Sequence, residues 1–157
     1  MISPAARTRF AHHVENELST LERFEVLLRR EQTLLVAGDT EALIAMTPQK
    51  TELHQQLQRQ HDQLVQLLGH EHVALDADAV RGFCADLPDT RARWERILEL
   101  GAEVRALNEL NGKLILERMQ SNQAALSALL SAAGQPALYD AEGAARPTGR
   151  GRHLGSA

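Results

Sequence analysis

The feature that most constrains this chain of 157 residues is a proline-free, leucine-rich stretch at residues 89–133. Asp89 or Thr90 can cap a helix at its start, and Gly134 followed by Pro136 is a typical stop. As a single helix this stretch would be about 67 Å long, too long for a globule of this size to enclose. It therefore has to lie along another long helix, and part of it can be left for a partner.

The composition favours helices along the rest of the chain. Strong helix formers (Leu, Ala, Gln, Glu and Arg) dominate it, whereas aromatic residues make up only 3%. We expect an all-α protein. Its architecture would be an elongated antiparallel helical hairpin, or an incomplete three-helix bundle, at residues 1–134. Residues 135–157 have almost nothing to bury and are expected to form a flexible C-terminal tail.

Prolines and glycines predict where the first helix begins and ends. Ser3 and Pro4 form a cap-plus-proline start, and Gly38 predicts an end after Ala37. Apolar residues at spacings of 3, 4 and 7 predict one buried face: Phe10, Val14, Leu18, Leu21, Phe24, Leu28 and Leu35.

A second helical segment is predicted from a cap at Asp39 or Thr40 to about residue 68. Two heptad series predict a coiled-coil seam along it: Leu43, Lys50, Leu57 and Leu64, and Met46, Leu53, Gln60 and Leu67. Thr47 and Pro48 predict a kink or restart within the segment. A short helix capped by Asp76 is expected to carry Val80, Phe83 and Leu87.

Residues able to do chemistry form no recognisable site. The seven histidines include none of the Glu-x-x-His pairs that bind metals in helical bundles, and there is no phosphate-binding loop. Cys84, beside Phe83, is interpreted as a small packed residue. We therefore expect no enzyme activity, no catalytic residues, and no metal or cofactor.

Charge and hydropathy argue against several other classes of protein. The net charge of −4, with acids and bases interspersed, argues against bulk binding to nucleic acid or anionic lipid. The N-terminus lacks the pattern of a signal peptide, and no apolar run approaches the roughly 20 residues of a membrane span. Together with the single cysteine, these features predict a soluble cytoplasmic protein.

Small and polar residues interrupt the long helix near its middle. Asn108, Asn111 and Gly112 are poor helix formers, at a cost of about 0.5 to 1 kcal/mol each. Their spacing places them near Gly101 and Asn122 on one face. Two explanations stay open: the face fixes the register of the protein's own helices, or it is adapted to a helix from another protein.

The same stretch resembles the most recognisable part of the FlgN family. The resemblance is carried by an N-x-x-N-G-x-L-I run: Asn108, Asn111, Gly112, Leu114 and Ile115. An A-L-x-x-L segment at 125–129 follows, then a glycine stop and a tail with tyrosine and glycine. The early part fits more loosely, through G-D-x-x-x-L at 38–43. Asp140 stands where family members tend to have glycine.

The resemblance implies a flagellar type III export chaperone. Such proteins bind C-terminal amphipathic segments of hook-associated proteins in the cytoplasm, prevent their premature self-association and deliver them to the export gate. The long helix offers an apolar wall for such a client helix: Leu107, Leu110, Asn111, Leu114, Ile115, Met119 and Leu126. The tail residues Tyr139 and Gly143 would dock at the export gate.

Two other functions remain as alternatives. The heptads at 43–67 would also suit a self-associating structural coiled coil or scaffold protein. The histidines and Cys84 motivate a helical metal-binding or redox protein. We expect a monomer or a weak dimer.

Overall fold

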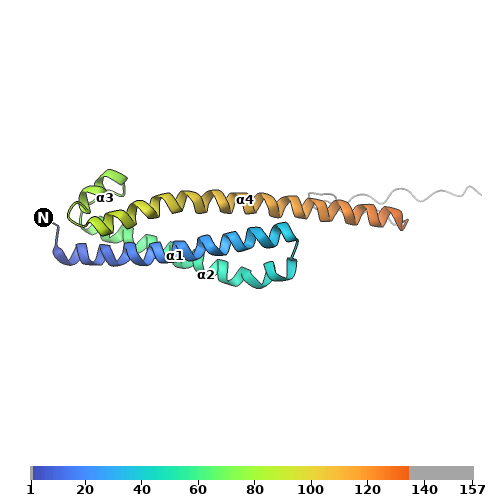
Figure 1. The fold of residues 1–157 in the computed structure, drawn as a ribbon, viewed down its shortest axis with the longest axis horizontal. Helices are drawn as coiled ribbons and strands as arrows, with labels where there is room; N and C mark the ends of the chain where they lie inside the picture. Colours follow the sequence, from blue (N-terminus) through green and yellow to red (C-terminus); the bar gives the residue numbers. More distant parts are fainter. Residues whose placement is uncertain (1, 135–157) are drawn as a thin grey trace, which may run out of the picture. The chain divides into compact units, whose positions relative to one another are not determined.

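The computed structural model describes residues 2–134, and this part of the chain is helical without any strand (Figure 1). Its helices are α1 (Pro4–Ala37), α2 (Thr40–His70), α3 (Ala77–Phe83) and α4 (Pro88–Ala132). The all-α prediction is confirmed. The chain divides into two compact units, Met1–Asn111 and Gly112–Ala157, so α4 contributes to both. The predicted boundary between residues 134 and 135 stays a prediction, because the tail lies outside the described residues.

The predicted caps begin α1 and α3, and the predicted glycine ends α1. The Ser3 side chain accepts a hydrogen bond from the Ala6 backbone N–H at 3.1 Å, and Asp76 does the same for Ala79 at 2.8 Å. Gly38 ends α1 in the left-handed conformation, at φ 71°. A residue without a Cβ adopts this conformation at little cost, so α1 ends where the sequence places its glycine.

The cap predicted at Asp89 or Thr90 is wrong, because α4 begins one residue earlier, at Pro88, whose fixed φ suits the first helical position. Leu87 does not belong to the short helix as predicted, since α3 ends at Phe83.

Pro48 does not end α2, so the predicted restart is wrong, whereas the predicted kink stays a prediction. The helix runs without interruption from Thr40 to His70 and so also passes the predicted end near residue 68. A proline inside a helix leaves the carbonyl of the residue four positions earlier without its N–H partner. Here that residue is Ile44, which is 68% exposed, so water can reach the orphaned carbonyl.

Helices α1 and α2 pack in antiparallel directions. Thr20 accepts a hydrogen bond from Gln60 at 3.0 Å, and Glu31 forms a salt bridge with Lys50 at 2.9 Å. Residues later in α1 thus contact residues earlier in α2, as expected for antiparallel helices. The heptad seam is confirmed, since its two series contain buried residues of α2: Met46, Leu53, Leu64 and Leu67.

The first part of α4 runs parallel to α1. Trp94 lies beside Phe10, with ring centroids 6.3 Å apart, and Asn111 hydrogen-bonds to the carbonyl of Leu28. Both pairs are separated by nearly the same number of residues. This constant offset defines the register between the two helices, and the three long helices of the first unit form the predicted incomplete bundle.

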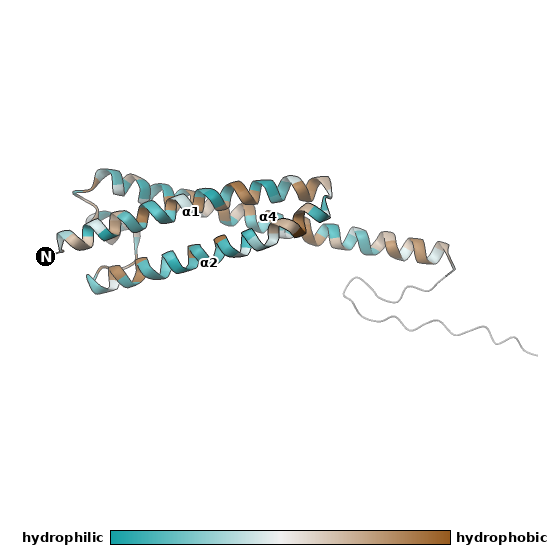
Figure 2. Ribbon diagram, turned by 90° about the horizontal axis from the view of Figure 1, so that it is seen from below, coloured by the Kyte–Doolittle hydropathy of each residue, from teal (hydrophilic) through white to brown (hydrophobic). Residues whose placement is uncertain are grey.

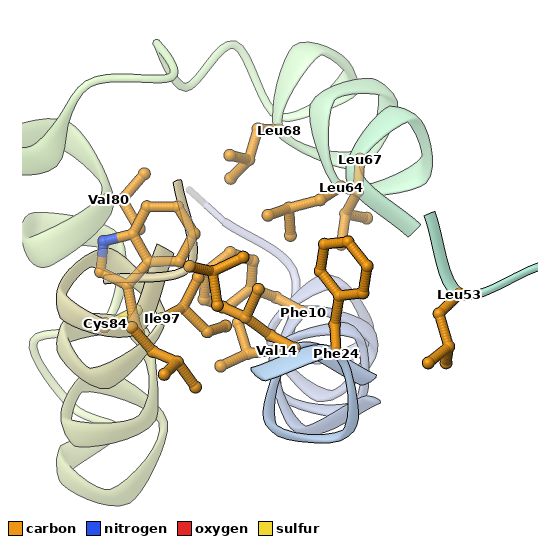
Figure 3. Packing of buried hydrophobic residues seen from close by; sticks show 14 of the residues in the cluster. Phe10, Val14, Phe24, Leu53, Leu64, Leu67, Leu68, Val80, Cys84 and Ile97 are labelled. Carbon is orange, nitrogen blue, oxygen red and sulfur yellow. The ribbon is translucent and has the colours of Figure 1, made fainter. Parts of the chain in front are cut away.

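The core of the first unit includes Val80 of α3 and Cys84 directly after it, together with residues of α1, α2 and α4 (Figure 3). Phe10 is fully buried and meets the ring of Phe83 edge-on, with centroids 4.9 Å apart. Cys84 is also fully buried, and burial raises the pKa of its thiol to about 11. A buried thiol that resists ionisation is a poor nucleophile, which supports its interpretation as a packed residue.

Candidate functional site

The part of α4 that follows Asn111 contains no buried residue up to residue 134. Hydrophobic residues nevertheless alternate with hydrophilic ones along it, as the brown and teal segments of the ribbon show (Figure 2). The large apolar side chains that are exposed in the second unit have exposed fractions of 38% to 69%: Ile115, Leu116, Met119, Leu126 and Leu129. Ile115, Met119, Leu126 and Leu129 are called the apolar stripe below. Helices in soluble proteins usually bury such residues against a neighbour.

The apolar stripe continues the helical periodicity of the buried face of α4. Steps of 7 and 4 residues lead from Val104, through Asn111, to Ile115. Further steps of 7, 4 and 3 lead through Asn122 to Leu126 and Leu129. Residues at such spacings lie on one side of a helix with 3.6 residues per turn. The residues that need a partner thus follow the same pattern on both sides of Asn111.

Asn111 is the last buried residue of α4 and is fully enclosed. Its side-chain amide donates to the Leu28 carbonyl at 2.8 Å and to Glu31 Oε1 at 2.9 Å. The Lys50 ammonium also donates to both carboxylate oxygens of Glu31, at 2.9 and 3.0 Å. This group, called the Asn111 network below, links α1, α2 and α4 through polar atoms and fixes their register.

Asn108 behaves differently from Asn111, although the two are one turn apart. It is exposed, as are Gly112 and Asn122. A Cβ added at Gly112 would meet no atom within 4 Å. Of the two explanations for this face, internal register therefore accounts for Asn111 and gives no reason for Gly112.

The residues proposed from sequence as a client-binding wall fall into three groups. Leu107 is half-buried against the core of the first unit. Leu110 is 45% exposed but lies about 100° around the helix from Asn111. Leu114 is half-buried, and the other apolar members are exposed: Ile115, Met119 and Leu126.

Asn111 is fully buried, so its side chain is not available on the surface of the wall that the sequence predicts. Leu116 and Leu129 were not included in that wall, and they also carry exposed apolar side chains on the same segment. The A-L-x-x-L spacing already pointed to Leu129. The proposed docking residues Tyr139 and Gly143 lie outside the described residues.

Residues 2–134 offer neither a metal site nor a membrane-spanning helix. No group of three or more His, Cys, Asp or Glu side chains in this range is arranged to hold a metal ion. No helix in the range combines the length and apolarity required to cross a membrane.

Comparison with known proteins gives the family. The family model described as FlgN protein matches residues 1–147, which is nearly the whole chain. The chain belongs to the FlgN family. Two similar curated relatives are each named "Flagella synthesis protein FlgN", one from Yersinia enterocolitica serotype O:8 / biotype 1B and one from Yersinia enterocolitica. Each is 29% identical over 140 residues, covering 88% of this chain and 90% of the relative. No solved structure matches this FlgN-family chain significantly.

Proposed function

We propose that this FlgN-family chain is a cytoplasmic flagellar export chaperone. It binds the C-terminal helical segments of hook-associated proteins, prevents their premature self-association and delivers them to the type III export gate. Membership in the family and the names of the two relatives support a role in flagellum synthesis. The observation that carries the chaperone proposal is the apolar stripe, whose side chains are exposed.

The apolar stripe suits an amphipathic client helix. Its side chains recur at helical spacing, which is how a helix presents anchors to a partner helix. Gly112 lies at the start of the same line and leaves space for a close approach of backbones. Asn122 lies in its middle, where a polar residue favours one register over others.

The decisive experiment is titration of the full chain with C-terminal segments of the organism's own hook-associated proteins. Isothermal titration calorimetry should give a one-to-one complex with a Kd in the micromolar range or below. Substituting Ile115→Asp together with Met119→Asp should abolish binding, because two charges would be buried in an apolar contact. The control is Val26→Asp, at an apolar position in α1 that is 68% exposed, close to the 64% of Met119. No binding by the unmodified chain would contradict the proposal, and equal losses in control and double variant would place the site elsewhere.

A self-associating scaffold protein is the alternative, because a second copy would also cover an apolar stripe. Multi-angle light scattering separates the two functions. The chaperone proposal expects a monomer or weak dimer that becomes a one-to-one complex when the client segment is added. A stable oligomer that the client segment does not dissociate would favour the scaffold.

Docking at the export gate is assigned to the tail, through Tyr139 and Gly143. We expect Tyr139→Ala to leave client affinity unchanged and to reduce secretion of hook-associated proteins in a motile host. Equal loss of client affinity and secretion would contradict this division of roles.

A further inference from the structure

A second surface feature lies within the first unit, on a different part of the molecule from the apolar stripe. It is a groove of about 470 Å³ bordered by α1, α2 and α4. Its walls include Leu57 of α2 and Ile97 of α4, and Glu17 and Leu21 of α1 form its floor. Every residue that lines it precedes Asn111, so its geometry is defined within one compact unit.

Glu17 is the unusual residue of this groove. It is only 8% exposed and lies among the apolar residues of the buried face of α1. Its Oε1 is 3.9 Å from Nδ1 of His61. Its Oε2 is buried and has no hydrogen-bond partner in the part of the chain that the structure describes. Burial raises the pKa of the Glu17 carboxyl, and the nearby His61 partly opposes that effect.

A carboxylate in this position is unfavourable for the bundle on its own. An ionised group removed from water loses hydration, and a contact of 3.9 Å with a half-exposed histidine compensates only weakly. A leucine at this position would continue the apolar face of α1 without that cost. A partially compensated acid in a groove is instead the arrangement expected where a second molecule supplies the missing charge.

The shape of the groove favours a helix as the second molecule. The α2 wall extends from His54 to His61, and the α4 wall from Ile97 to Arg105. Each wall is about two helical turns long. On α4 the wall includes Gly101, where an added Cβ would meet nothing within 4 Å, so a neighbouring backbone can approach closely. The three long helices leave one side of the bundle open, and a helix placed in the groove would complete a four-helix bundle.

We propose that this groove binds an amphipathic helix of a protein partner, which presents one lysine or arginine from its apolar face to Glu17. The other charged and titratable groups that line the groove are His54 and His61 of α2 and Arg105 of α4, of which His61 lies 3.9 Å from Glu17. Among the groups lining the groove, Glu17 is the only acid, so a single cation matches it. The binding determinants are separate from the apolar stripe, and the proposal therefore holds or fails independently of the chaperone function.

The test uses a display library of amphipathic helices of about 18 residues. Each peptide has apolar residues at its heptad positions, except for one position on the apolar face that is randomised. The library is selected on the full chain carrying Ile115→Asp and Met119→Asp, so that the apolar stripe cannot capture it. Selected peptides should carry Lys or Arg at one apolar-face position. Selection on the same protein with Glu17→Gln added should lose that preference.

Two affinity measurements make the outcome decisive. Replacing the selected cation by leucine should weaken binding about tenfold or more, as expected for a hydrogen bond to a charged group. The same replacement should change binding less than about twofold when Glu17→Gln is present. Filling the groove with Ala102→Trp should abolish binding, and circular dichroism shows whether each variant remains folded. A library that yields no cation preference, or only peptides insensitive to Ala102→Trp, would overturn the proposal.

Discussion

The two parts of α4 differ in burial far more than in sequence. From Thr90 to Val104 the helix buries a residue every three or four positions, and Asn111 follows seven positions later, whereas residues 112–134 include no buried one. Leucine, isoleucine and methionine nevertheless recur at helical spacing in the second part. An amphipathic pattern therefore predicts that a helix packs against a partner. Only the arrangement of the other helices shows whether that partner is part of the same chain.

The Asn111 network lies where this difference begins. It uses an amide, a carboxylate and an ammonium from three helices, at the end of the buried part of α4. Buried polar groups of this kind add little net stability but penalise every register in which they would lose their partners. The network therefore fixes which residues of α4 remain covered by the bundle.

The largest difference between the two parts is expected for truncation of apolar side chains. Phe10→Ala removes a fully buried ring that meets Phe83 and Trp94, and should lower the free energy of unfolding by about 3 to 5 kcal/mol. Met119→Ala, at a side chain that is 64% exposed, should change it by less than about 0.5 kcal/mol. Urea unfolding followed by circular dichroism measures both. A comparable loss for Met119→Ala would mean that the second part is packed in the free protein.

Alanine substitutions of Asn111 and Asn108 should also differ in their effect on the free energy of unfolding, with the larger loss at the buried residue. Asn111→Ala leaves Glu31 without one of its buried donors and should cost about 1 to 3 kcal/mol of unfolding free energy. Asn108→Ala, on the exposed side, should be neutral or stabilise by about 0.5 kcal/mol, since alanine is the better helix former. Urea unfolding of the two variants, measured side by side, gives the comparison. Equal effects would contradict the assignment of the register to Asn111.

Alanine substitutions of Gly112, at the start of the second unit, and of Gly134, after the end of α4, should have different effects on stability. Gly112→Ala should stabilise the free chain by about 0.5 to 1 kcal/mol, because the position is helical and the added methyl group meets open space. Gly134→Ala should not stabilise it, since this residue adopts φ 76°. Thermal unfolding measures both effects. If a client helix approaches Gly112, the same Gly112→Ala variant should bind the client segment less tightly, and an unchanged affinity would exclude close approach there.

The smallest expected effect is the pH dependence contributed by Glu17. Its folded-state pKa lies above the ordinary value of 4.5, so the folded state binds this proton more tightly than the unfolded state. The resulting stabilisation is complete below pH 4.5 and is lost as the pH rises through the raised pKa. Glu17→Gln should therefore be more stable than the unmodified chain at pH 7.5, and the gap should narrow towards pH 4. A gap that widens on acidification would show that the carboxylate is stabilised by its surroundings.

Local sequence signals predicted the helices well but missed particular boundaries. Ser3, Gly38 and Asp76 act where their chemistry suggests, because caps depend on backbone atoms only a few residues away. The restart predicted at Pro48 did not occur, because the cost of a proline depends on whether the orphaned carbonyl can reach water, which is a property of the packed molecule.

The apolar spacing of the first helix already placed two acids, Glu17 and Glu31, on its buried face, although the sequence analysis did not list them. Alternating steps of 4 and 3 from Phe10 place both acids on the buried face of α1: Phe10, Val14, Glu17, Leu21, Phe24, Leu28, Glu31 and Leu35. An acid on an apolar face signals either a buried ion pair or a functional site. The spacing cannot separate these roles, because Glu31 meets Lys50 and Asn111 whereas Glu17 meets only a distant histidine.

The sequence by itself determined that this chain forms long amphipathic helices with sharp ends, because helix propensity, capping and periodicity act over a few residues. It also placed the FlgN-like run at the centre of the longest helix. Only the tertiary structure decided which of the two neighbouring asparagines is enclosed, which acid has a partner, and where the covered part of α4 ends. These properties depend on the register between helices that are far apart in the chain, and that register is set by packing the whole bundle.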